Sequence, residues 1–191
     1  LAAAHAALAD PAGRREPALP GRTPRIGLPR QMGEVALEPE IAEGLARAGA
    51  TLSAAAEVVE IDLAGWEPGR ARRGGLLLVE AEGAVALADL LGQPGAVSEG
   101  LAALLAYGRD LPSARLCEAL DRMRRAREAA HAALAHVDAL LLPTAPQLPF
   151  PHGADVPANQ ADLTALANFA GLPDAAIHAM WAALCLPRSS S

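Results

Sequence analysis

The sequence contains no lysine, and all 16 of its basic residues are arginine. Because 22 acidic residues outnumber them, the chain carries a net charge of −6, which disfavours binding to nucleic acid. Aromatic residues account for only 3% of the 191 residues, whereas hydrophobic residues account for 52%. We therefore expect a globular chain whose core is built mainly from leucine, alanine and valine.

Cysteines and long apolar runs are also scarce. Cys117 and Cys185 lie far apart without a C-x-x-C pattern, which favours a reduced cytoplasmic setting over a disulfide framework. The N-terminal segment lacks the basic flank of a signal peptide, and acidic residues interrupt every run that approaches about 18 apolar residues. The sequence therefore predicts a cytoplasmic protein that contacts no membrane. Because it begins at Leu1 on residues typical of a helix end, we expect its first residue not to be the start of a gene product.

The first half of the chain predicts a βαβ unit. Residues 25–28 form a short strand candidate that Pro29 ends, and the β-branched, alternating residues 58–63 indicate a second strand. Between them, Pro39 is typical of the first residue of a helix, and Gly49 is expected to end that helix. Two strands joined by such a crossover helix are expected to lie parallel.

Helical patterns dominate the middle of the chain, over residues 76–91 and 98–107. Ser113 is expected to cap the longest helix, over 113–137. Its buried face is predicted to consist of six apolar residues at steps of three or four: Leu116, Leu120, Met123, Ala130, Leu134 and Val137. Residues 139–142 are apolar throughout and predict a fully buried strand.

A stiff loop and a short helix follow that strand. Prolines fix the backbone of the loop at five positions: Pro143, Pro146, Pro149, Pro151 and Pro157. Asp162 stands where a helix N-cap is expected, and Gly171 stands where that helix should end. The predicted fold class is thus α/β, with βαβ units and a mixed sheet flanked by helices.

Two segments resemble the amidase-signature family: DALLLPTAP at 138–146 and QADLTALANFAGLP at 160–173. A third, PRIGLPR at 24–30, is similar but less specific. The resemblance implies that residues 1–173 form the C-terminal half of an amidase, a hydrolase of linear amides with a partial amidase-signature fold. It further implies a relationship to the A subunits of tRNA-dependent amidotransferases. Residues 174–191 do not match the family pattern and are expected to form an aberrant tail.

Enzymes of this family use a Ser–cis-Ser–Lys triad, and the resemblance implies that the triad lies outside this chain. The sequence contains neither a lysine nor a Gly-Gly-Ser-Ser stretch. We therefore expect no catalytic residue and no cofactor here, and no activity from this chain alone. Its implied partners are the missing N-terminal half of the domain and a small-molecule amide substrate.

Asp162, Gln160 and Thr164 are the candidate substrate-binding residues. In the related A subunits, the aspartate that matches Asp162 contacts the ammonium group of the amide donor. A capping role and a substrate contact are both compatible with the sequence, since a capping carboxylate keeps spare lone pairs. Those subunits also carry an arginine where this chain has alanine and leucine at 103–105, which argues for a less charged amide than glutamine.

Polar residues in the proline-rich loop offer a weaker alternative. His152, Asp155 and Asn159 lie near Gln160 but lack the spacing of metal ligands, so we expect solvated residues and no metal. The arginines at 122–127 are likewise expected to form a solvated helix face. The alternative function is a non-catalytic α/β binding or interaction domain, which the presence or absence of an upstream catalytic segment distinguishes from an amidase.

Overall fold

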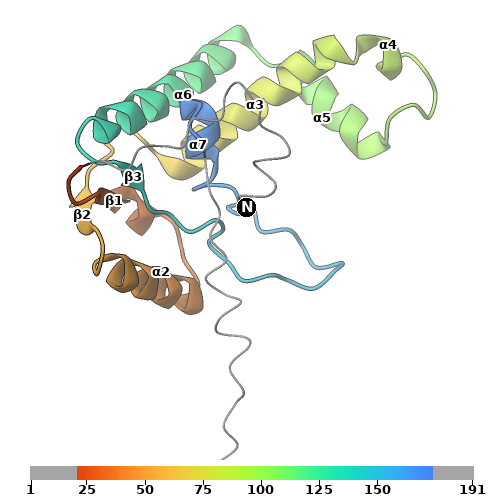
Figure 1. Cartoon of the computed structure of the whole chain (residues 1–191). Coiled ribbons are helices and arrows are strands. Elements are labelled where there is room, and N and C mark those ends of the chain that lie inside the picture. Colours follow the sequence, from red (N-terminus) through yellow and green to blue (C-terminus); the bar gives the residue numbers. More distant parts are fainter. Residues whose placement is uncertain (1–20, 174–191) are drawn as a thin grey trace, which may run out of the picture.

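The computed structural model describes residues 21–173 (Figure 1). Its elements in chain order are β1 (Arg25–Pro29), η2 (Arg30–Glu34), α2 (Pro39–Leu52), β2 (Glu57–Ile61), α3 (Pro68–Ala86), α4 (Ala88–Leu91), α5 (Glu99–Arg109), α6 (Ser113–Leu134), β3 (Ala139–Leu140) and α7 (Ala165–Ala170). The helix expected before residue 10 and the tail expected at 174–191 lie outside the described residues.

The predicted βαβ unit is confirmed. Strands β1 and β2 pair in parallel over their whole length, with Arg25 opposite Glu57 and Pro29 opposite Ile61. Strand β3 pairs with the other side of β1, also in parallel, which gives the order β2-β1-β3. The α/β class is therefore confirmed. The predicted mixed sheet is wrong for the described strands, because both strand pairs are parallel.

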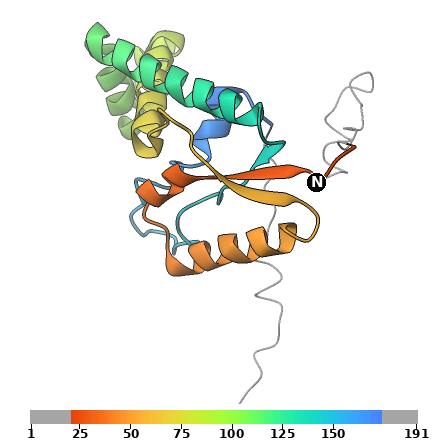
Figure 2. The ribbon, with the colours of Figure 1, turned by 90° about the vertical axis from the view of Figure 1, so that its left-hand side faces the viewer.

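Helices cover both faces of this small sheet. Helix α2 lies on one face, and α3, α6 and α7 lie on the other (Figures 1 and 2). The main core forms between the sheet and these last three helices. Its most deeply buried members are Leu63, Trp66, Ala71, Ala126, Ala130, Leu163 and Leu166. Helix α5 packs along the outer half of α3, where Gly108 lies against the Glu80 backbone, and α4 lies at the far end of α3, away from the sheet (Figure 1).

Helix α6 is continuous, as predicted, but its start and its buried face differ from the prediction. Pro112 is the N-cap in an extended conformation, so Ser113 is already helical and forms no capping hydrogen bond. Leu120 is 44% exposed. The buried residues of the helix are all small: Ala119, Ala126, Ala129 and Ala130. Of the predicted face, Ala130 and Val137 are buried, but the helix ends at Leu134, before Val137. Small residues are required because α3 packs closely, and a Cβ at Gly74 would lie 3.1 Å from the Ala119 carbonyl oxygen.

The predicted fully buried strand at 139–142 is wrong in length and burial. Strand β3 contains only two residues, of which Ala139 is exposed and Leu140 is half-buried. The Leu141 amide still donates to the Gly27 carbonyl at 2.9 Å, after which the chain turns away from β1. The residues are only partly covered because β3 is an edge strand of the described sheet.

Two other helices differ from the prediction in their bounds. Helix α3 begins at Pro68, well before residue 76, because proline suits the first helical turn although arginines and glycines follow it. Helix α2 begins at Pro39 as predicted but continues past Gly49 to Leu52. The start of α5 agrees with the prediction, since Ser98 Oγ accepts from the Leu101 amide at 3.2 Å.

Candidate functional site

The predicted capping role of Asp162 is wrong. Helix α7 begins at Ala165, its N-cap residue is Thr164, and no side chain caps it. The end of the helix agrees with the prediction, because Gly171 adopts the left-handed conformation with φ 63°. Asp162 therefore lies before the helix, and its carboxylate is free to contact another element.

That element is the start of α3. Arg72 Nε donates to Asp162 Oδ1 at 2.6 Å, and the two side chains are only 18% and 11% exposed. The second carboxylate oxygen lies against the α3 backbone, since a Cβ at Gly69 would be 3.0 Å from Oδ2. A buried charge needs such a partner, so this ion pair fixes the segment before α7 to the first turns of α3.

Gln160 lies in a different environment from Asp162. It lines a hollow of about 430 Å³ within the proline-rich loop. The lining is mostly apolar and is formed by Pro149, Phe150, Pro151, His152, Gly153, Ala154, Val156 and Gln160. Thr164 is half-buried at the start of α7. The structure thus places Gln160 in the loop hollow, Asp162 against α3, and Thr164 at the N-cap position of α7.

The loop that forms this hollow is tied to α2 by Glu38. The Glu38 amide donates to the Pro146 carbonyl at 2.9 Å, and Glu38 Oε2 accepts from the Leu148 amide at 2.8 Å. Within the loop, Gln147 Nε2 donates to Asn159 Oδ1. These contacts hold both ends of the loop. The role of Glu38 was not predicted, because a residue just before a helix gives no signal of a partner 110 residues away.

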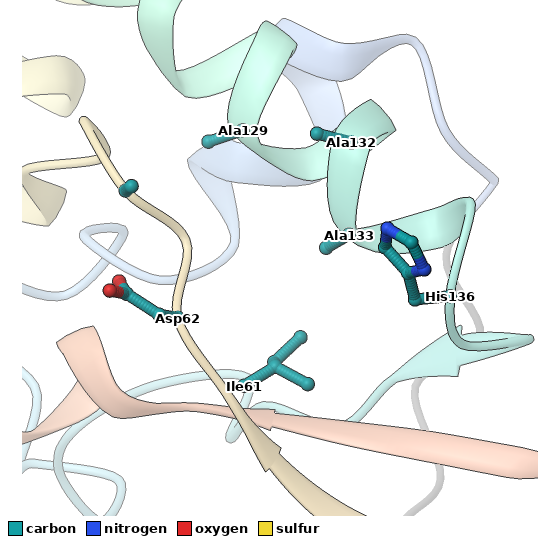
Figure 3. A pocket seen from close by; sticks show the side chains of 7 residues that line it. Ile61, Asp62, Ala129, Ala132, Ala133 and His136 are labelled. Carbon is teal, nitrogen blue, oxygen red and sulfur yellow. The ribbon is translucent and has the colours of Figure 1, made fainter.

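A second hollow, of about 350 Å³, lies between the end of β2 and α6 (Figure 3). Its lining residues are Ile61, Asp62, Ala64, Ala129, Ala132, Ala133 and His136. Asp62 and His136 lie on opposite sides of it (Figure 3), and Asp62 Oδ1 accepts from Gln31 Nε2 at 2.5 Å. His131 does not take part, since its ring contacts the Ala170 carbonyl at 3.0 Å. No sequence pattern predicted this hollow.

Within residues 21–173, no group of three or more His, Cys, Asp or Glu side chains is placed to hold a metal ion. His152 and Asp155 are exposed in the loop. None of the helices in the same part of the chain is both long and apolar enough to cross a membrane. The described residues offer two features as the candidate site. One is the loop hollow that Gln160 lines, and the other is the buried ion pair of Arg72 with Asp162, which follows Gln160 closely in the sequence.

Comparisons with known proteins agree with this fold. The family model described as Amidase matches residues 12–187, which includes part of the segment expected to form an aberrant tail. A solved amidase structure matches 83% of this chain with a TM-score of 0.68 and 26% identity. The amidase-signature-type fold expected from the sequence is confirmed. Among curated proteins, none matches this chain.

Two further solved structures are similar in fold. A bacterial aryl acylamidase belonging to the amidase-signature family matches 83% of this chain, with a TM-score of 0.65 and 16% identity. The A subunit of the glutamyl-tRNA(Gln) amidotransferase from Thermotoga maritima matches 81%, with a TM-score of 0.50 and 18% identity. This chain covers only 40%, 38% and 36% of the three solved chains, respectively.

Proposed function

We propose that this chain, which belongs to the amidase family, is the part of an amide-hydrolysing enzyme that forms one wall of its substrate pocket. The family match over residues 12–187 carries the proposal. The likeness to a solved amidase over 83% of the chain supports it. Because the chain covers 40% of that solved amidase, the remaining structure of the enzyme has to come from outside these residues.

The catalytic residues belong to that remaining part. By the family resemblance, the nucleophilic serine of a Ser–cis-Ser–Lys triad attacks the amide carbonyl, and the lysine takes up its proton through the second serine. This chain contains no lysine, so it supplies no such base. In the proposed enzyme it is the C-terminal half, and alone it hydrolyses no amide.

The pocket wall consists of the loop hollow and the residues that follow it. Prolines and Phe150 give the hollow an apolar lining suited to the non-reacting part of a small amide. Gln160 adds a side-chain amide, which can both donate a hydrogen bond to a polar substrate group and accept one from it. Asp162 and Thr164 are the other proposed contacts, and Glu38 holds the loop in place. The substrate is a small amide.

The first experiment separates the two parts of the enzyme. We expect this chain, purified alone, to turn over none of a panel of aliphatic and aryl amides, and the complete enzyme that contains it to hydrolyse at least one. The DNA upstream is expected to encode a lysine and a Gly-Gly-Ser-Ser segment. Turnover by the purified chain, retained after removal of residues 174–191, would contradict the assignment of the triad to another segment.

The second experiment tests the pocket wall in the complete enzyme. Gln160→Ala is expected to raise KM for the best amide, because it removes a polar contact to the bound substrate. Gln93→Ala is the matched control, since Gln93 lies in the exposed turn after α4, and within residues 21–173 its side chain donates only to the Asp89 carbonyl. Equal KM values for both variants would show that the loop hollow is not part of the substrate pocket.

The absence of lysine also favours a second candidate function, a non-catalytic α/β binding domain. In that case the loop hollow binds a small molecule without chemistry. Saturable binding of an amide by the purified chain, with no turnover and no catalytic segment encoded upstream, would select this alternative.

A further inference from the structure

Asp162 is one of two charged residues that the described part of the chain buries, the other being Glu80. Its charge is already balanced, because Arg72 Nε lies 2.6 Å from Oδ1 and both side chains are largely shielded from water. An ammonium group approaching this carboxylate would have to displace the guanidinium. In a shielded site that exchange is unfavourable, since the displaced arginine would remain close by without its partner.

The ion pair lies where ligands of open α/β sheets commonly bind. Helix α3, which carries Arg72, follows the carboxyl end of the parallel strand β2. Open parallel sheets hold ligands outside the carboxyl ends of their strands. Asp162 closely follows Gln160, which lines the loop hollow. A substrate group that extends from the hollow toward α3 would therefore meet the charges of Arg72 and Asp162.

A second arginine near the ion pair also disfavours the approach of a cationic group. Arg73 forms no ion pair within residues 21–173, and its Nη1 lies 3.6 Å from the position that a Cβ of Gly69 would occupy. The same position is 3.0 Å from Asp162 Oδ2. Arg73 is exposed, so it adds a positive charge beside the buried ion pair that water partly screens. A cationic substrate group is repelled there, whereas an uncharged group meets no such penalty.

We propose that Arg72 determines the substrate specificity of this enzyme, because its ion pair with Asp162 makes the pocket select amides without an ammonium group at that position. The proposal rests on the proposed amidase function and names its substrate class. Asp162 then acts as the partner that holds Arg72 in place, and it does not bind a cationic amide donor.

The kinetic test uses the complete enzyme that contains this chain and two amides of the same size, pentanamide and 4-aminobutyramide. The second carries an ammonium group where the first has a methyl group. In Arg72→Gln the side-chain nitrogen is bonded to Cδ, as Nε is in arginine, so a donor to Asp162 remains while the charge is removed. We expect the kcat/KM ratio of the ammonium amide to pentanamide to rise about 10- to 100-fold.

Arg70→Gln is the matched control, because Arg70 lies on the same helix but pairs with Glu67 at the surface, where the two side chains are 61% and 48% exposed. Its selectivity ratio is expected to stay within about twofold of the wild type. An unchanged ratio in Arg72→Gln would overturn the role of Arg72. If neither amide is hydrolysed by the wild-type enzyme, the proposed function fails on these substrates, and the binding test below still decides the role of Arg72.

The binding test needs no turnover and uses the purified chain with methylammonium as the probe. The NMR signal of the Asp162 carboxyl carbon is followed during the titration. We expect no saturable shift in the wild type and a saturable shift in Arg72→Gln. A saturable shift in the wild type would show that Asp162 is open to cations, and the proposal would be wrong. That outcome remains measurable even if Arg72→Gln does not fold, and Arg72→Met provides a second variant.

Discussion

The body and the arm of this molecule bury their apolar residues differently. The body consists of the sheet with α2, α6 and α7, and the arm consists of α4, α5 and the second half of α3 at residues 76–86. In the body, Leu163 and Leu166 are at most 1% exposed. In the arm, Val79, Val85 and Leu104 are 64%, 80% and 49% exposed. Large side chains therefore stabilise the body, whereas the arm depends on another kind of contact.

That contact is the close approach of two helix backbones. A Cβ at Gly108 of α5 would overlap the Glu80 carbonyl carbon of α3, and a Cβ at Gly83 would lie 2.8 Å from Leu105. Only glycine allows so close an approach. Leu105 is the one large side chain that α5 buries, so the arm has much less apolar contact area than the body.

The body and the arm each bury one carboxyl group, and the two groups differ in their partners. Asp162 in the body has Arg72 as a partner. Glu80 in the arm has no ion pair or side-chain hydrogen bond among residues 21–173, and burial alone raises the pKa of its carboxyl group above the ordinary value. The body thus holds a charge that its neighbours compensate, and the arm holds a group that burial shifts toward the neutral form.

The largest effect is expected from Leu163→Ala in the body. Because Leu163 is completely buried in the core, its truncation should lower the free energy of unfolding by about 3 kcal/mol. Leu104→Ala in the arm is the matched comparison and should lower it by less than about 1 kcal/mol. Chemical denaturation of both variants measures the difference. Equal losses would mean that the arm and the body are packed alike.

Gly108→Ala tests the contact that holds the arm. The added methyl group would overlap the backbone of Glu80 and Ala81, so α5 has to move away from α3, at a cost of about 2 kcal/mol. Gly100→Ala, on the same helix, is the control, since the added group meets no atom of another element within 4 Å. Thermal unfolding followed by circular dichroism should separate the two. If both variants melt alike, α5 does not rest on this contact.

Much of the fold was predictable because its signals are local. The alternation in β2, and Pro39 at the start of α2, are read within a few residues of the sequence. The buried face of α6 was not predictable in this way. Alanine suits either side of a helix, and only the approach of α3 decides that Ala119 is buried and Leu120 exposed.

The candidate site, too, was predictable only where the signal is local in the sequence. The prolines and Gln160 were assigned to a shaped loop from their own sequence, and the structure places Gln160 in its hollow. The partner of Asp162 was not found, because Arg72 lies 90 residues away and no periodicity connects the two. An aspartate before an apolar run has the same local pattern whether it caps a helix or pairs with a distant arginine.

A pH series on Glu80→Gln would sharpen the contrast between the two buried carboxyl groups. Since burial raises the pKa of Glu80, the folded protein keeps its proton to a higher pH than the unfolded chain does. Between the ordinary and the raised pKa, the free energy of unfolding therefore falls as pH rises. Glu80→Gln lacks this loss, so it should be modestly more stable than the wild type at pH 7 and equally stable below that window.

The control is Glu82→Gln, because Glu82 lies on the same helix and is exposed. Its stability should follow that of the wild type at every pH. If Glu80→Gln is instead less stable than the wild type at pH 7, the ionised carboxylate has a favourable partner in solution, and the difference from Asp162 disappears.

The smallest effect is expected from Val85→Ser at the far end of the arm. Val85 is 80% exposed, so serine removes almost no contact and buries no new polar group. The free energy of unfolding should change by no more than about 0.5 kcal/mol. Ala84 lies on the buried side of the same turn and is 7% exposed. Ala84→Ser should therefore lower the free energy of unfolding by about 1 to 3 kcal/mol, because the new hydroxyl has to be desolvated. Denaturant titrations of the two variants decide the matter. A loss for Val85→Ser as large as that for Ala84→Ser would mean that another surface covers this face of α3 in solution, and the exposed valines of the arm would then belong to a buried interface.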